Sequence, residues 1–291
     1  MLCWAGAGIA VKEALVVFTP LTLIVLRFSL AIILMLLVGL FFRHNDVLGL
    51  QPLDKHDIPL FILGGLFQPF LYFIFETYTY QSFASPTIAE AMLSTQPILA
   101  PIFAFIILRE KVSSNNILGI ILSTMGMLLL LLVGTNDFAL GNPWGILLAV
   151  VTVSMSVGYT IILRRIPTRY SSLTIVFYVQ LVALVMFYIV WGIFDRQPLH
   201  HTIVSLSADI TPVIAVGYLA VFASVTAFIL FCYTVRQIGV TRANVFNNVR
   251  PVFTALLMWV IFDEHLPIWK WVGIFVIVIG LFISQKQRKI E

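Results

Sequence analysis

The chain has 291 residues, of which 60% are hydrophobic and only 10% are charged. A water-soluble domain carries about 25% charged residues, so this composition excludes a soluble globular protein and indicates a polytopic membrane protein. The net charge of +4 does not indicate nucleic-acid binding, because the basic residues lie at the ends of apolar runs, where membrane topology explains them.

Ten apolar runs follow one another along the chain, and a membrane span needs about 20 such residues. Their length predicts helices rather than the short alternating strands of a barrel. The first run is short, since Lys12 and Glu13 leave only about 16 Å of helix before them at 1.5 Å per residue. We therefore expect the natural first helix to begin before residue 1. The runs cover about 2–18, 20–42, 58–80, 86–108, 114–133, 143–163, 171–194, 210–236, 240–262 and 266–284.

The segments 86–126 and 240–280 are two copies of one pattern, aligned without a gap at eight identical positions of 41. The informative matches are the non-hydrophobic ones: Pro97 with Pro251, Glu110 with Glu264, Gly119 with Gly273 and Gly126 with Gly280. Repetition divides the chain into a five-helix repeat at 1–134, a second at 135–284, and a tail at 285–291. Because each repeat has an odd number of helices, the second enters the membrane from the opposite side. The prediction is an all-α integral membrane fold of ten transmembrane helices in two inverted repeats.

The Lys and Arg residues predict the orientation. With the N-terminus in the cytoplasm, twelve of the 17 lie in inner turns, three lie outside, and Arg27 and Arg250 fall within spans. Both termini are therefore predicted to be cytoplasmic, which makes 285–291 a cytoplasmic tail.

Three charged residues interrupt the spans of the first half, namely Arg27, Glu76 and Glu90. Counting from the predicted outer ends of their helices, all three lie about 6–10 Å below the outer surface. One hypothesis is a salt bridge that ties helices together. The other is a cavity that binds a charged solute or a proton, because two close carboxylates resist simultaneous ionisation. Tyr72 and Tyr78 add hydrogen-bonding groups and aromatic faces to this region.

The fourth predicted span carries Glu90, Ser94, Pro97 and Pro101 at spacings of four, three and four, which places them on one helix face. Each proline removes an amide donor and leaves a carbonyl without its helical partner. Such a break is either a packing kink or a hinge beside a cavity. Its recurrence at Pro251 favours the hinge.

The ninth predicted span replaces these groups with amides, since Asn244, Asn247 and Asn248 precede Arg250. Gln180 on the seventh span is a further amide within an apolar run. Interhelical hydrogen bonding explains each of them singly. Together they predict an amide-rich, basic inner end of a solute path, opposite an acidic outer end.

The sequence contains no motif that predicts catalysis. No nucleophile elbow, phosphate-binding loop or dinucleotide fingerprint occurs, and Cys3 and Cys232 predict neither a disulfide framework nor a metal site. We therefore expect no enzyme activity and no cofactor. An intramembrane enzyme or lipid-processing protein and a non-transporting scaffold are the alternatives to a transporter.

The motifs in order resemble the drug/metabolite transporter superfamily, specifically bacterial exporters with two EamA domains. They include Trp4 through Lys12, the pair Arg27-Phe28, the turn Leu108-Arg109-Glu110 and the turn Phe262-Asp263-Glu264. The resemblance implies a central cavity lined by helices 1–4 and 6–9. It also implies export of amino acids, other metabolites or drugs across the inner membrane by alternating access. The expected partners are a small-molecule solute, the lipid bilayer and, in a second hypothesis, protons, with monomer or homodimer left open.

Overall fold

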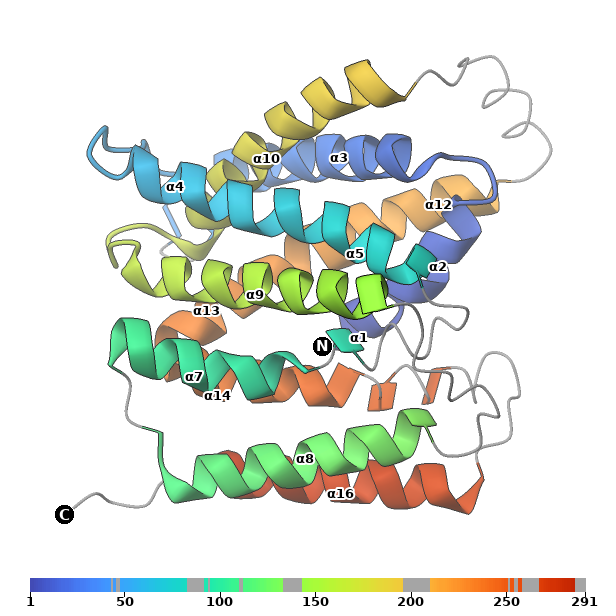
Figure 1. The fold of residues 1–291 in the computed structure, drawn as a ribbon. Helices are drawn as coiled ribbons and strands as arrows, with labels where there is room; N and C mark the ends of the chain where they lie inside the picture. The colour runs from blue at the N-terminus through green and yellow to red at the C-terminus, as the bar shows by residue number, and fades with distance from the viewer. Residues whose placement is uncertain are drawn as a thin grey trace. The chain divides into compact units, whose positions relative to one another are not determined.

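The computed structural model describes residues 1–42, 44–45, 48–82, 92–93, 95–109, 112–132, 143–195, 210–250, 252–253, 256–257 and 267–285. Every regular element within these ranges is a helix (Figure 1). Five of the described helices are long and apolar enough to cross a membrane, which confirms a multi-pass helical architecture. They span Pro20–Phe41, Ile58–Thr79, Pro143–Arg165, Ser172–Phe194 and Thr211–Ile238.

The chain divides into two compact units, each of which draws segments from both halves of the sequence. Unit 1 comprises 1–5, 71–164 and 234–291, and unit 2 comprises 6–70 and 165–233. The prediction of two sequential five-helix repeats concerns the symmetry of the sequence, and it stays a prediction.

Unit 2 is built around the packing of α3 against α10, with α4 also on α10 and α2 on α12. Its core includes the stacked rings of Phe28 and Phe187, whose centroids are 5.6 Å apart. Both rings are fully buried, so they anchor the contact between α3 and α10. The elements are α2 (Ala7–Ala14), α3 (Pro20–Phe41), α4 (Ile58–Gly65), η1 (Leu66–Leu71), α10 (Ser172–Phe194), α12 (Thr211–Tyr218), η2 (Leu219–Thr226) and the start of α13 (Ala227–Ile238).

The starts of α3 and α10 are capped in the same way. The hydroxyls of Thr19 and Ser171 each accept a hydrogen bond from the amide three residues on, at 3.2 and 3.0 Å. Thr19 also donates to Asp195, the residue after α10, and Ser171 donates to the carbonyl of Gly49, in the segment after α3. Each helix therefore begins where the other ends, and the pair is antiparallel.

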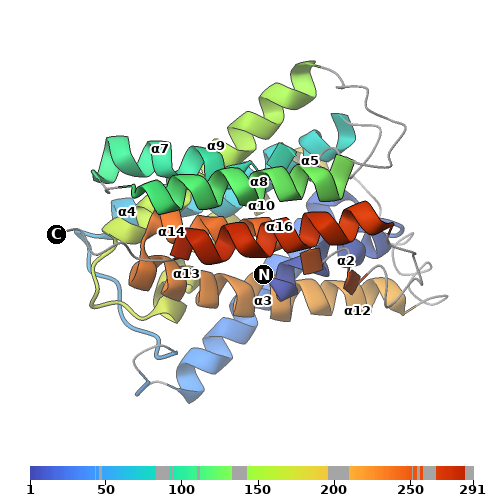
Figure 2. The same ribbon diagram turned by 90° about the horizontal axis from the view of Figure 1, so that it is seen from below.

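Unit 1 contains a second antiparallel pair, α8 and α16, which lie side by side in both views (Figures 1 and 2). Glycines permit the close approach, since a Cβ on Gly119 would lie 2.5 Å from the Gly280 carbonyl oxygen. A Cβ on Gly126 would lie 2.8 Å from the Gly273 oxygen. The elements are α1 (Leu2–Ala5), α5 (Tyr72–Ser82), α7 (Gln96–Leu108), α8 (Ser114–Leu132), α9 (Pro143–Arg165), α14 (Val240–Val245), η3 (Phe246–Val249) and α16 (Ile268–Gln285).

Several predicted spans are interrupted rather than continuous. Between α4 and α5, Gln68 has non-helical backbone angles and is followed by Pro69, which cannot donate a helical hydrogen bond. Pro97 lies in the first turn of α7, where a missing amide removes no bond within that helix. Pro101 lies inside α7, as predicted. Pro251 lies outside the described residues, and a hinge at these prolines stays a prediction.

Candidate functional site

Unit 2 holds a buried charged residue in the middle of an apolar helix. The side chain of Arg27 on α3 is only 5% exposed. Its Nε donates to Ser224 Oγ at 3.1 Å, and its guanidinium carbon lies 5.1 Å from the centre of the Phe28 ring. The hydrogen bond and the cation–π contact both stabilise the charge away from water.

Gln180 on α10 meets the same serine from another side. Its Nε2 donates to the backbone oxygen of Ser224 at 2.7 Å, and Ser224 lies within the π-helix η2. The side chain is fully buried, and its Oε1 has no hydrogen-bond partner within the described part of the chain. The predicted residues Arg27 and Gln180 therefore both bind Ser224, and Gln180 Oε1 is a buried acceptor that no described group uses.

Of the two predicted acidic groups, Glu76 belongs to the described part of the chain. Glu76 is on α5 in unit 1, where its Oε1 accepts a hydrogen bond of 2.8 Å from the Tyr72 hydroxyl one turn earlier. Tyr78 on the same helix is 56% exposed. Glu90 and Ser94 lie outside the described residues. A joint cluster of Arg27, Glu76 and Glu90 consequently stays a prediction.

Unit 1 holds an amide network centred on Asn244 of α14, which is fully buried. Its Oδ1 accepts from Gln96 Nε2 at 2.6 Å and from Asn247 Nδ2 at 3.2 Å. Its Nδ2 donates to the Val240 backbone oxygen at 2.9 Å and to Thr160 Oγ1 at 3.4 Å. The network joins α7, α9 and the α14–η3 segment.

Asn248 makes a different kind of contact. Its Nδ2 donates to Ser123 Oγ on α8 at 2.7 Å, and its Oδ1 is buried without a partner among the described residues. The side chain thus faces a neighbouring helix, in the manner of an interhelical hydrogen bond. A solute-binding role for Asn248 stays a prediction.

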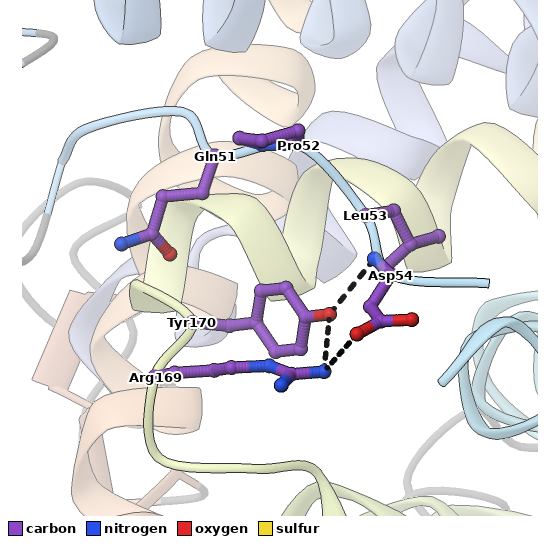
Figure 3. A pocket seen from close by; sticks show the side chains of 6 residues that line it. All are labelled: Gln51, Pro52, Leu53, Asp54, Arg169 and Tyr170. Atoms are coloured by element: carbon purple, nitrogen blue, oxygen red, sulfur yellow. Dashed lines mark hydrogen bonds and ion pairs between the residues drawn. The ribbon is translucent and has the colours of Figure 1, made fainter. Parts of the chain in front are cut away.

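A pocket with a volume of about 440 Å³ lies in unit 2 (Figure 3). It is formed where the segment after α3 meets the segment before α10. The side chains of Asp54, Arg169 and Tyr170 point toward one another across it. Its walls are Gln51, Pro52, Leu53, Asp54, Arg169 and Tyr170.

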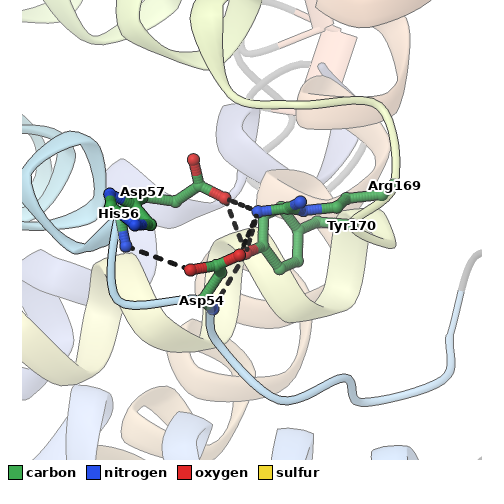
Figure 4. Close-up of polar contacts among 5 residues, drawn as sticks. All are labelled: Asp54, His56, Asp57, Arg169 and Tyr170. Atoms are coloured by element: carbon green, nitrogen blue, oxygen red, sulfur yellow. Dashed lines mark hydrogen bonds and ion pairs between the residues drawn. The ribbon is translucent and has the colours of Figure 1, made fainter.

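Three of the pocket residues, Asp54, Arg169 and Tyr170, also belong to a group of polar contacts with Asp57 (Figure 4). Arg169 pairs with Asp54 at 3.0 Å and with Asp57, and the Tyr170 hydroxyl donates to Asp57 at 2.7 Å. The Tyr170 hydrogen bond and the Arg169 charge hold the pKa of Asp57 below its usual value. The hydrogen bond from Arg169 to the Tyr170 hydroxyl, together with its pairing with Asp57, raises the pKa of Arg169. We refer to Asp54, Asp57, Arg169 and Tyr170 as the clasp, because their side chains mainly bind one another.

Sequence reasoning did not identify the partners of these amides. The missed residues share short hydroxyl or amide side chains inside apolar helices, where single occurrences are common. Gln96 had a usable signal, since it aligns with Arg250 in the second copy of the repeat. The others are Ser123, Ser156, Thr160 and Ser224.

No metal site emerges from the geometry of the described chain, in which no three His, Cys, Asp or Glu side chains form a group that could hold an ion. The amide and arginine sites can donate and accept hydrogen bonds. They contain no adjacent nucleophile and base of the kind that covalent catalysis requires.

Comparisons with known proteins agree with this chemistry. The model of the EamA-like transporter family matches residues 1–132 and 143–285. The uncharacterized transporter YetK of Bacillus subtilis is 26% identical over 288 residues, covering 98% of this chain and 84% of its own. An uncharacterized transporter of Archaeoglobus fulgidus is 22% identical over 285 residues, covering 98% and 95%. A crystal structure at 20% identity, covering 98% of this chain and 94% of its own, has a TM-score of 0.76 and therefore shares the fold.

Proposed function

Because this chain belongs to the EamA-like transporter family, we propose that it exports small metabolites, in the class of amino acids and related charged or zwitterionic solutes. The observation that carries the proposal is the buried cluster of Arg27, Gln180 and Ser224 within apolar helices of unit 2. Ionisable groups inside membrane spans are costly, and they mark solute paths in many transporters. Drugs are a second substrate class that the same groups would accept.

Alternating access between two inverted repeats is the mechanism that we propose. The glycine contacts in unit 1 support it, because they are reciprocal under the sequence alignment. Gly119 and Gly126 of the first repeat approach Gly280 and Gly273, which are the counterparts of Gly126 and Gly119. The antiparallel α3–α10 pair supports the same mechanism, because these are the second and seventh predicted spans and occupy equivalent places in the two repeats. Ten helices in two inverted halves explain both pairs.

We place the chain in the bacterial inner membrane with both termini in the cytoplasm. The distribution of Lys and Arg supports this orientation, because twelve of the 17 then lie in cytoplasmic turns or in the tail. Export is the direction that follows if cytoplasmic solute enters between the predicted inner ends of the helices.

The direct test is metabolite profiling of the medium from cells that overexpress the protein. We expect one or more small metabolites to accumulate outside cells with the wild-type chain and not outside cells with Gln180→Leu at equal amounts in the membrane. Gly192→Ala is the matched control, because a Cβ at Gly192 meets no atom within 4 Å. A medium identical to that of empty-vector cells would overturn the proposal.

Proton coupling through Glu76 or Glu90 is a separate part of the proposal. A carboxylate close to the outer interface can load a proton from outside and release it inside. In liposomes, Glu76→Gln and Glu90→Gln proteins should therefore transport a metabolite identified by the profiling at a rate that depends less on pH, between 6 and 8, than the wild-type rate does. Wild-type rates from both variants across this range would exclude proton coupling and leave the export proposal standing.

A further inference from the structure

The amide network of unit 1 has a fixed direction. Asn244 Nδ2 donates to the Val240 carbonyl, which can only accept. It also donates to Thr160 Oγ1, whose single hydrogen is committed to the Val157 carbonyl at 2.7 Å. Both contacts require the nitrogen of the Asn244 amide on this side. The Asn244 oxygen must therefore face the other way.

This orientation dictates the amides on either side of Asn244. Its oxygen can only accept, so Gln96 and Asn247 must both present their nitrogens to it. Gln96 Nε2 donates its second hydrogen to Ser156 Oγ at 2.8 Å. The carbonyl oxygens of Gln96 and Asn247 are consequently turned away from the network.

The network uses neither of these oxygens. Gln96 and Asn247 are half-buried, and within the described chain neither Gln96 Oε1 nor Asn247 Oδ1 has a hydrogen-bond partner. They lie where the backbone changes, because α7 begins at Gln96 and α14 gives way to the 3-10 helix η3 at Phe246. Solute sites in many secondary transporters lie at such breaks near the middle of the membrane.

We propose that Gln96 and Asn247 form a subsite for a solute group that carries several N–H hydrogens, namely a primary ammonium or a primary carboxamide. Two carbonyl acceptors held in place by Asn244 complement such a group, whereas on these two side chains only the second hydrogen of Asn247 Nδ2 remains to bind a carboxylate. This inference rests on the proposed transport function and specifies the substrate class. Asn244 is a positioning residue, and Gln96 and Asn247 contact the solute.

The test measures thermal stabilisation of the purified full-length protein in detergent by a matched set of probes. The probes are phenethylamine, 3-phenylpropionamide, 3-phenylpropionate and L-phenylalanine, which share a phenylalkyl body and differ in the terminal group. We expect the three probes with an N–H group to raise the Tm by at least 2 °C and 3-phenylpropionate to leave it unchanged. Comparison of phenethylamine with 3-phenylpropionamide shows whether the subsite prefers a primary ammonium or a primary carboxamide.

Two variants and a control tie the effect to the subsite. Gln96→Met and Asn247→Leu should each reduce probe affinity at least tenfold. The test needs only one of these two variants to fold. Ser123→Ala, which removes an interhelical hydrogen bond outside the network, should bind as the wild type does. Equal stabilisation by 3-phenylpropionate, no stabilisation by any probe, or unchanged affinity in both variants would overturn the subsite. Export in the metabolite assay together with such a result would refute this inference alone, whereas no exported metabolite would refute the transport function.

Discussion

Asn244 and Asn248 are neighbours on one predicted helix face, but their surroundings differ. Asn244 satisfies both ends of its amide within a network of side chains and backbone. Asn248 makes one bond to Ser123 and leaves its oxygen buried without a partner in the described chain. A buried acceptor without a partner costs about 1–3 kcal/mol, so the two residues contribute unequally to stability.

The consequence is measurable by removing each amide. Asn248→Leu combined with Ser123→Ala should change the free energy of unfolding by less than about 1 kcal/mol, because it removes an unsatisfied acceptor along with one hydrogen bond. Asn244→Leu should destabilise by about 2–4 kcal/mol, because it leaves the amides of Gln96 and Asn247 without their common acceptor. Thermal unfolding in detergent measures both. Loss of transport in a stable Asn248→Leu protein would instead place Asn248 on the solute path.

Asp57 carries the pH dependence of the clasp. Its pKa lies below the usual value of about 3.9, chiefly because Tyr170 donates a hydrogen bond to its ionised form and Arg169 attracts it. A depressed carboxylate pKa adds stability above the usual pKa, and this stability is lost as the pH falls through the lower folded-state value. The difference in Tm between wild type and Asp57→Asn should therefore be constant from pH 5 to 8 and shrink below about pH 4. A difference that disappears already between pH 7 and 5 would contradict this assignment.

The residue types of the polar sites were predictable, and their partners were not. Arg27, Gln180 and Asn244 are conspicuous in apolar runs, and periodicity places them on helix faces. Their partners Ser224, Gln96 and Thr160 depend on which helix packs opposite. That choice is made by tertiary contacts between residues that are 44 to 197 positions apart. A single helix pattern holds no information about it.

At the scale of elements, the α8–α16 pair depends on the absence of side chains at three glycine positions, Gly119, Gly126 and Gly280. A Cβ at Gly126 would lie 2.7 Å from the Ile277 backbone nitrogen and 2.8 Å from the Gly273 oxygen. Backbone atoms in a helix cannot move aside singly, so the helices would have to separate. Small residues of this kind are what allow close helix contact within lipid.

Gly126→Ala should therefore lower the Tm of the protein, by an amount equivalent to about 1–3 kcal/mol for an overpacked contact. Gly192→Ala and Gly217→Ala are controls on other helices, because nothing lies within 4 Å of an added Cβ at either position. Those two changes should leave the Tm unchanged or raise it, since alanine is the better helix former. A Gly126→Ala protein as stable as the controls would show that the pair tolerates a wider spacing.

Helix positions were largely predictable at this scale, whereas their interruptions were not. The predicted spans 20–42, 114–133 and 171–194 agree with α3, α8 and α10 to within one or two residues. Hydrophobic length suffices for these, because a span in lipid must satisfy its backbone internally. The π-helix η2 lies inside an apolar run without a proline, and only its packing distinguishes it from an ordinary helical turn. At Gln68 the next residue is Pro69, a signal that the prediction of one continuous span over 58–80 overlooked.

For the whole molecule, the inverted repeat predicts that equivalent positions of the two copies lie on opposite sides of the membrane. Positions 113 and 267 are equivalent in the alignment of the two copies, 154 residues apart. A parallel duplication would place both on the same side. An inverted one places Ser113, which precedes α8, in the cytoplasm and Pro267, which precedes α16, outside.

Cysteine labelling decides between these arrangements. In a background with Cys3→Ser and Cys232→Ala, we expect a membrane-impermeant maleimide to label Pro267→Cys but not Ser113→Cys on intact cells. Inside-out vesicles should give the opposite result, and Lys55→Cys should behave as Ser113→Cys does, because Lys55 lies in a predicted inner turn. Labelling of both 113 and 267 from one side would refute the inverted repeat. Alternating access between symmetric halves would then lose its structural basis, while membership of the transporter family would stand.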